Sequence, residues 1–151
     1  IQKEVFVKQI ALAEKFDKPI TIHSRDAAQD TFDILKSCLN CRRGAVLHSF
    51  SQSSEMLKLY LDMNVFFSIS GVVTFKNADK LRETVKLIPI DRMFIETDCP
   101  YMTPVPFRGK RNRPDMTEYT ARVCAELKGM AYEDFCEKTS ENAEKFFGFG
   151  I

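Results

Sequence analysis

The chain has 151 residues, 44% of them hydrophobic and 13 of them phenylalanine, which suits one ordinary domain with a substantial core. Its formal net charge of +1 excludes binding of polyanions by net charge alone, so any nucleic-acid surface has to be local. The sequence contains no apolar run of the roughly 20 residues that a membrane span needs, and we identify no signal peptide.

The five cysteines are an odd number spread over different predicted elements, which favours free thiols over a disulfide framework. Cys38 and Cys41 form a C-x-x-C pair. No second thiol pair or nearby histidine completes a zinc site there, so a plain helix-end pair is the better interpretation. Together these features predict a cytoplasmic protein.

Helices and strands alternate through the first hundred residues. The apolar pattern predicts helices over residues 1–16, 26–39 and 79–87, a further helix whose inner stripe includes Met56 and Tyr60, and strands over 20–23, 45–48, 65–69 and 92–97. Ser24 or Asp26 is the expected N-cap of the second helix, and one of the serines at 51, 53 and 54 that of the third.

The last third of the chain is expected to be a loop followed by helices. Residues 100–114 hold four of the six prolines and a group of cations, which predicts a long, rigid loop. Helices are predicted near 115–128, 132–138 and 140–147, and Asp115 with Glu118 resembles a capping box.

Four strands joined by helical crossovers predict an α/β fold with a parallel sheet. The strands are apolar at nearly every position, as a sheet covered on both faces requires. In such folds the active site lies at the carboxyl edge of the sheet, so polar residues at strand ends are of special interest.

Three strands end in side chains that can bind a metal ion. Ile20–His23 and Ala45–His48 each end in one of the chain's two histidines, and the strand from residue 92 runs into Asp98. A packing role does not explain an imidazole or a carboxylate at the end of a buried strand. Two histidines and one aspartate suit Zn²⁺, Mn²⁺ or a similar divalent ion, which can lower the pKa of its bound water to about 7.

The alternation of strand side chains also places Glu96 on the same face as Asp98, one layer deeper in the sheet. Each residue has a simpler interpretation when taken singly: a histidine at a strand end as a satisfied polar residue, and Asp98 as the start of a turn. The coincidence of all three at one sheet edge favours a metal-dependent hydrolase site.

At these residues the chain resembles the TatD family of metal-dependent deoxyribonucleases, which are amidohydrolase-like TIM barrels. The resemblance covers essentially the whole chain in order. Its motifs are Lys-Pro-Ile-Thr-Ile-His-Ser-Arg-Asp-Ala at 18–27, His-Ser-Phe-Ser at 48–51, Ser-Gly-Val-Val-Thr-Phe at 70–75, Ile-Glu-Thr-Asp-Cys-Pro-Tyr at 95–101, Pro-Val-Pro-Phe-Arg-Gly-Lys-Arg-Asn at 104–112 and Asn-Ala-Glu-Lys-Phe-Phe-Gly at 142–148.

The resemblance implies a site and an activity. His23, His48 and Asp98 would bind one or two divalent ions (Mg²⁺, Mn²⁺ or Zn²⁺), Asp98 would also orient or deprotonate the attacking water, and Glu96 would support the ligands from behind. The implied activity is that of a 3′–5′ exonuclease on DNA. Ser49 and Gln52 depart from the family pattern, since many members have Cys at the first position and Gly is common at the second.

The resemblance also indicates how much of a barrel this chain contains. A TIM barrel needs roughly 250 residues, so 151 residues correspond to about the last four β/α units of a (β/α)8 barrel. We therefore expect residues 1–151 to be the C-terminal part of one metallohydrolase barrel whose N-terminal half is absent from this chain or is supplied by a second chain. The protein is otherwise expected to be a monomer.

A basic cluster follows the Asp98 strand. Arg108, Lys110 and Arg111, with Asn112, lie in the proline-rich loop, and Ser24 with Arg25 lies beside His23. Guanidinium groups bind phosphate oxygens bidentately, so these residues are predicted to contact DNA, although a charge run is often only a solvated surface. Of the nearby rings, Phe107 or Tyr101 is a candidate for stacking on a terminal base.

Two other functions fit the sequence. The same barrel hosts enzymes that act on small amides, lactones or phosphoesters, so the fold alone does not choose the substrate. The chain by itself could also be an inactive half-barrel. The basic loop favours the nuclease.

Overall fold

The computed structural model describes residues 1–40 and 42–148, and its strands form one parallel sheet in the order β1-β2-β3-β4. The strands are β1 (Ile20–His23), β2 (Ala45–His48), β3 (Val65–Ile69) and β4 (Met93–Ile95). The helices are α1 (Gln2–Lys15), α2 (Ala28–Cys38), α3 (Ser54–Tyr60), α4 (Asp79–Leu87), α5 (Thr117–Lys128) and α6 (Tyr132–Phe147), with short 3₁₀ helices η1 (Gly71–Thr74), η2 (Ile90–Arg92) and η3 (Pro114–Met116).

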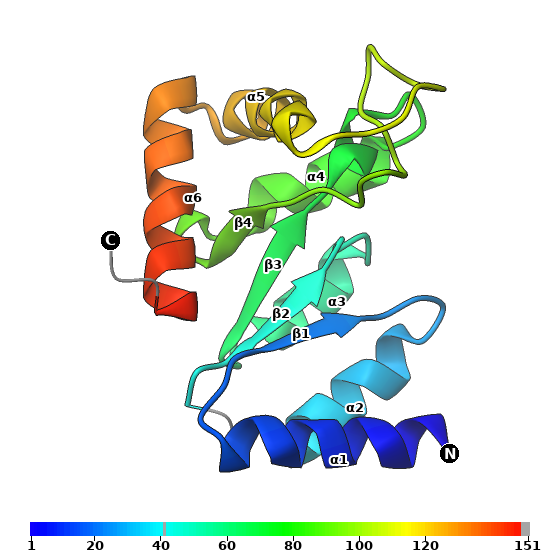
Figure 1. Cartoon of the computed structure of the whole chain (residues 1–151), viewed down its shortest axis with the longest axis vertical. Helices are drawn as coiled ribbons and strands as arrows, with labels where there is room; N and C mark the ends of the chain where they lie inside the picture. Colours follow the sequence, from blue (N-terminus) through cyan, green and yellow to red (C-terminus); the bar gives the residue numbers. More distant parts are fainter. Residues whose placement is uncertain (41, 149–151) are drawn as a thin grey trace.

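The predicted α/β class and parallel sheet are confirmed. Figure 1 shows the strands fanned between α1 with α2 at one end and α5 with α6 at the other. The register pairs Ile20 with Ala45 and His23 with His48, so the two histidines are direct partners at the ends of neighbouring strands. The fold itself therefore brings both imidazoles to the carboxyl edge of the sheet.

The main core lies between one face of the sheet and the helices. Alternate strand residues such as Leu47, Phe67 and Met93 point to this face and are buried completely. Each of the six α-helices contributes at least one buried apolar side chain to the same cluster, as amphipathic crossover helices do.

The opposite face of the sheet carries a smaller cluster near the amino ends of the strands. Val46 and Phe94 pack there with Phe146 of α6, and Phe66 packs against them. The rings of Phe66 and Phe94 stack at a centroid distance of 5.3 Å. The same face carries His48 and Glu96 two residues further along β2 and past β4, so one sheet face is apolar at one end and polar at the other.

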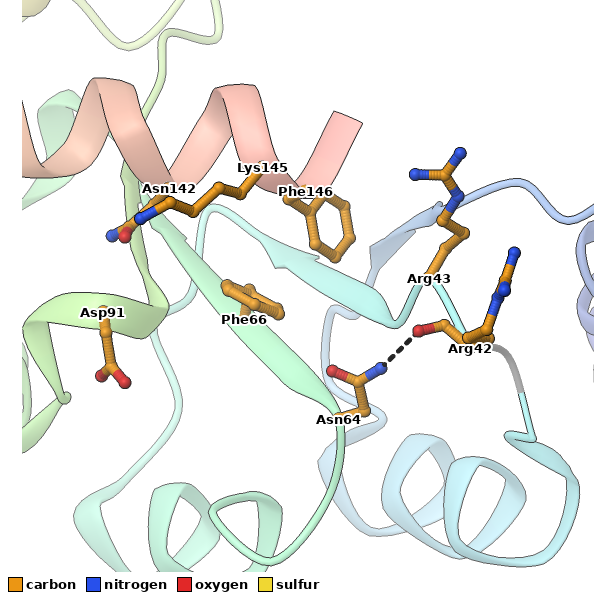
Figure 2. Close-up of a pocket in the computed structure, with 8 residues that line it drawn as sticks. All are labelled: Arg42, Arg43, Asn64, Phe66, Asp91, Asn142, Lys145 and Phe146. Carbon is orange, nitrogen blue, oxygen red and sulfur yellow. Dashed lines mark hydrogen bonds between the residues drawn. The ribbon is translucent and has the colours of Figure 1, made fainter. Parts of the chain in front are cut away.

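A pocket of about 400 Å³ opens at the amino end of the strands (Figure 2). Its lining includes Arg42, Arg43 and Asn64, which come just before β2 and β3. None of the residues that the sequence predicts for the site lies in this lining. This pocket is therefore separate from the predicted site.

Two predicted element boundaries were wrong. The helices expected at 132–138 and 140–147 are one continuous helix, because only an unbroken α6 buries Phe135, Asn142 and Phe146 on one face. The strand expected over 92–97 is only Met93–Ile95, since its partner β3 ends at Ile69 and the last backbone bond runs from Glu96 N–H to the Ile69 carbonyl.

Of three predicted helix caps, one is confirmed. The Ser53 side chain accepts a hydrogen bond from the backbone N–H of Met56, as an N-cap does. The residue at the start of α2 is Ala27, without a side-chain cap, while Asp26 has a φ of 52° in the preceding turn. No capping box forms with Asp115, because this carboxylate pairs with Arg113 in the same turn.

Phe67→Ala should lower the free energy of unfolding by about 3–5 kcal/mol, because its buried ring packs against Phe50 and Tyr60. Urea denaturation of the purified chain measures this change. Phe16→Ala, at a ring position that is 61% exposed, is the matched control and should cost much less. Equal losses for the two variants would contradict the assigned core.

Candidate metal centre

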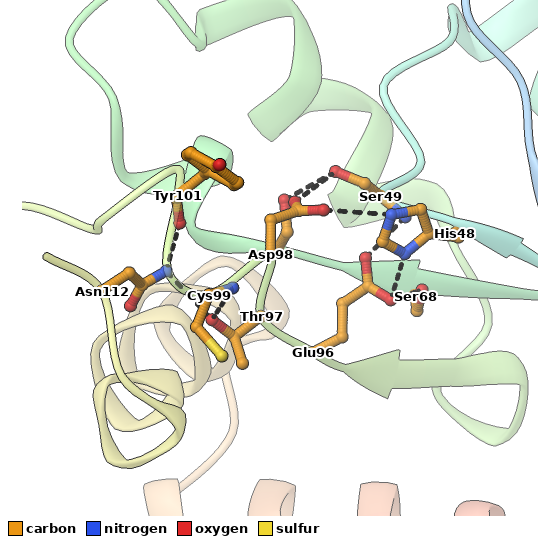
Figure 3. A network of polar contacts seen from close by, with 10 residues as sticks. His48, Ser49, Ser68, Glu96, Thr97, Asp98, Cys99, Tyr101 and Asn112 are labelled. Carbon is orange, nitrogen blue, oxygen red and sulfur yellow. Dashed lines mark hydrogen bonds and ion pairs between the residues drawn. The ribbon is translucent and has the colours of Figure 1, made fainter.

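Three side chains from two strand ends meet at the carboxyl edge of the sheet (Figure 3). The Nδ1 atom of His48 lies 2.8 Å from Glu96 Oε2, and its Nε2 atom lies 3.0 Å from Asp98 Oδ1. The ligand atoms that these three residues offer all lie within 4.8 Å of one another. All three side chains are 20–24% exposed, so a small ion or a water molecule can reach them.

Glu96 is held by three hydrogen bonds. Besides the contact with His48, its carboxylate accepts a bond of 2.6 Å from the Ser68 hydroxyl and one of 2.6 Å from the backbone N–H of Ser49. Ser68 is 2% exposed, so this bond is sheltered from water. A carboxylate with its oxygens used in this way is suited to orienting His48, as carboxylates behind metal-bound histidines do.

Sequence reasoning did not find Ser68, although its signal was present. It is the one polar residue of the strand Val65–Ile69, and it lies on the face that carries Glu96. A hydroxyl in an otherwise apolar strand has to find a hydrogen-bond partner when it is buried, so its position already indicated a polar group nearby.

Ser49 reaches the cluster through a backbone that side-chain-bearing residues rarely adopt. Its φ is 47°, in the left-handed region. In this conformation its N–H donates to Glu96, and its hydroxyl lies 2.7 Å from the Ser70 hydroxyl and donates to Asp98 at 3.3 Å. Backbone in this sparsely populated region is typical of functional sites that the surrounding structure fixes.

His48 gains a proton more easily than an ordinary histidine. Burial lowers its pKa, but the hydrogen bond and charge of Glu96, followed by those of Asp98, outweigh burial and raise the pKa above its usual value. The protonated ring can donate to a carboxylate from each nitrogen. His48, through Nε2, and Asp98 would hold a divalent cation in place of the second of these protons, so the donor set fits a metal ion.

His23 lies beside this cluster rather than within it. Its ring centroid is 5.7 Å from that of His48. Both histidines line a pocket of about 870 Å³ together with Asp98, Ser24 and Arg25. The structure thus gathers the three predicted ligands around one pocket, with Glu96 in contact with His48. Their binding of a metal stays a prediction.

The predicted phosphate-binding residues divide into two groups. Ser24 and Arg25 line the pocket, and the Ser24 hydroxyl is bonded to the Thr31 hydroxyl at 2.9 Å. The cations of the loop do not line it. Arg108 stacks on Phe75 at 3.8 Å and donates to the Thr103 carbonyl.

The remaining residues of the loop have different surroundings. Lys110 and Arg111 are exposed. Asn112 is 4% exposed and donates to Thr97 Oγ1 at 3.0 Å and to the Tyr101 carbonyl at 2.6 Å. Both protons of its amide are used inside the protein, so Asn112 braces the loop in this structure. Substrate contact by these loop residues stays a prediction.

The cysteines that the structure describes, at positions 38, 99, 124 and 136, are free thiols. Cys41 lies outside the described residues, so the C-x-x-C pair is not described. None of the helices in residues 1–40 and 42–148 is long and apolar enough to cross a membrane.

Glu96→Gln should lower the pKa of His48 in the metal-free protein, because the carboxylate is the main group that raises it. An NMR pH titration of the ring protons measures both histidines, and His23 is the internal control. In the wild type, the contact between His48 and Glu96 stabilises the folded state fully at pH values below the pKa of an unfolded histidine, about 6.5. This stabilisation is lost as the pH rises through the higher pKa of His48 in the folded state. An unchanged His48 pKa would contradict the network.

The family model of the TatD related DNases matches residues 1–148. Among curated relatives, the uncharacterized metal-dependent hydrolase YabD of Bacillus subtilis is 50% identical over 147 residues, which are 97% of this chain and 58% of that protein. The uncharacterized metal-dependent hydrolase YcfH of Escherichia coli K12 is 40% identical over 146 residues, 97% of this chain and 55% of that protein. The chain thus spans a little under three fifths of the length of these relatives.

Solved structures show the same likeness. The TatD homologue YjjV of Escherichia coli K12 superposes with a TM-score of 0.88 at 26% identity, covering 95% of this chain and 55% of that one. A TatD family hydrolase of Entamoeba histolytica has a TM-score of 0.78 at 22% identity over 93% of this chain and 54% of that one, which shows the fold alone. These likenesses support the TIM-barrel type of fold. With a family match from residue 1 to residue 148, this chain belongs to the TatD-related DNase family.

Proposed function

We propose that the protein is a metal-dependent deoxyribonuclease. It would hydrolyse phosphodiester bonds at DNA ends, with 3′–5′ polarity. The observation that carries this proposal is the cluster of His48, Glu96 and Asp98, two of whose members, His48 and Asp98, line a pocket together with Arg25. Family membership and relatives described as metal-dependent hydrolases support it.

Within this proposal the four strands are the last four of a (β/α)8 barrel. Three observations support this: the parallel order β1-β2-β3-β4, the polar cluster at the carboxyl edge, and the share of the relatives' length that the chain covers. Residues from the remainder of such a barrel would complete the ligand set, whether in one chain or in a second chain.

His48, Asp98 and His23 would hold one or two divalent ions (Mg²⁺, Mn²⁺ or Zn²⁺), with Glu96 fixing the ring of His48. Such an ion, when bound, lowers the pKa of a water ligand and neutralises charge on the phosphate. With Nδ1 bonded to Glu96, Nε2 is the nitrogen of His48 that would bind the ion beside Asp98. Asp98 orients the attacking water and accepts its proton.

Arg25 would be the main contact to the phosphate, because it is the one lysine or arginine among the described residues that line this pocket. It lines the pocket, its only ion pair in the described chain is a 4.0 Å contact with Asp26, and its side chain is 81% exposed. The guanidinium therefore remains available for a bidentate bond to phosphate oxygens. Ser24, Arg108, Lys110 and Arg111 extend the proposed contact surface, and Asn112 acts by holding the loop.

Asp98→Asn should abolish metal-dependent trimming of end-labelled single-stranded DNA, because the variant loses both a ligand charge and the proton acceptor. Assays of the 151-residue chain with Mg²⁺ or Mn²⁺, and with EDTA as the blank, measure this loss. Asp91→Asn, at the pocket of Figure 2, is the matched control and should cleave normally.

Two results would count against this proposal in different ways. Full activity of Asp98→Asn would contradict the assigned site. Absence of cleavage by the wild type and both variants would show that this chain alone is not the catalyst.

Arg25→Ala should weaken binding of single-stranded DNA and reduce the slope of log K against log salt by about 0.7, the value for one lost phosphate contact. Fluorescence anisotropy at several salt concentrations measures the slope. The double variant Lys110→Ala, Arg111→Ala tests the loop in the same way, and Arg25→Lys keeps the charge as a control. An unchanged salt-dependence slope in Arg25→Ala would show that Arg25 does not contact a phosphate.

A further inference from the structure

One large aromatic side chain is exposed at the pocket that His48 and Asp98 line. Tyr101 is 74% exposed, its neighbour Met102 is 44% exposed, and both line the pocket that holds His48 and Asp98. Among the residues that the structure describes, the side chain of Tyr101 makes no ring-stacking contact, cation–π contact or hydrogen bond. An exposed aromatic ring beside a polar reaction centre is a surface available for a flat ligand.

The backbone beneath this ring is fixed although the ring is free. The Tyr101 N–H donates to the Asp98 carbonyl at 2.8 Å, and the Tyr101 carbonyl accepts from the buried Asn112 amide at 2.6 Å. The Met102 carbonyl packs so closely on Gly71 that a Cβ there would come within 2.7 Å of it. A ring on such a braced loop loses little backbone entropy when it binds a ligand.

Phe107, the other aromatic residue of this loop that could stack on a base, already packs against another ring. The ring of Phe107 packs edge-on against Tyr119 at a centroid distance of 5.0 Å, and the Lys110 ammonium lies 5.6 Å from it. Phe107 therefore holds the loop against α5. Tyr101 is left as the loop's free aromatic surface, three residues after Asp98 along the chain.

We infer that Tyr101, with Met102 beside it, is a stacking subsite for the nucleobase adjacent to the phosphate that is cleaved. This inference rests on the proposed function and names the part of the substrate that the pocket binds besides phosphate. Every base offers a π-face, so the subsite accepts all four bases and favours strands whose terminal bases are unpaired. Arg25 on the pocket lining supplies the matching contact to phosphate.

The test compares two single-stranded octanucleotides, each with an internal fluorescein and phosphorothioate linkages that prevent cleavage. One carries normal bases throughout, and the other carries an abasic residue at each end. Anisotropy titrations in Ca²⁺ give both dissociation constants for the 151-residue chain. The wild type should bind the base-ended strand on the order of ten-fold more tightly, as expected for one aromatic stack.

Three variants isolate the ring of Tyr101. Tyr101→Ala should lose the preference for the base-ended strand, whereas Tyr101→Phe should keep it because the ring remains. Phe16→Ala, which removes an exposed aromatic ring from the end of α1, should also keep it. Thermal unfolding confirms that each variant is folded.

The possible failures are distinct. Equal binding of the two strands by the wild type, or an unchanged preference in Tyr101→Ala, would overturn the stacking subsite and leave the proposed nuclease standing. Failure of the wild type to bind either strand would overturn the subsite together with DNA as the ligand of this chain, and it would count against the proposed function.

Discussion

The carboxylate of Glu96 is the point on which the site depends. It accepts hydrogen bonds from the end of β2 through His48 and Ser49 and from β3 through Ser68, while it is itself carried by the segment after β4. A negative charge that is only one-fifth exposed is costly unless such donors surround it. The arrangement therefore fixes three strand ends relative to one another and sets the orientation of His48.

The side chains around Glu96 differ in whether their polar groups are used inside the protein or remain exposed. Asn112 and Thr103 use their polar groups inside the loop after Asp98. Arg25 and Tyr101 remain exposed on the pocket lining. Side chains that brace the loop have lost their rotational freedom on folding, while exposed side chains such as those of Arg25 and Tyr101 keep most of it.

The sheet has two chemically different ends because side chains alternate and because the strands are parallel. The face that carries Phe66 and Phe94 near the amino ends carries Ser68 and Glu96 two residues later. Phe146 of α6 covers the apolar end, and the Asn142 amide ties the same helix to the Ile90 and Met93 carbonyls. The last helix thus closes one end of the sheet and leaves the polar end open.

The α/β class, the four strands and the polar residues at their ends could be predicted from the sequence alone, because strand periodicity and the alternation of helices and strands are visible along the chain. Tertiary structure decided what local patterns do not contain. It joined α6 into one helix and shortened β4, because buried partners set those boundaries. It also brought Ser68 into a hydrogen bond with Glu96 and Asn112 into a hydrogen bond with the Tyr101 carbonyl, and it packed Phe107 against Tyr119 while the ring of Tyr101 stayed exposed. These contacts join residues far apart in the sequence, so local patterns do not predict them.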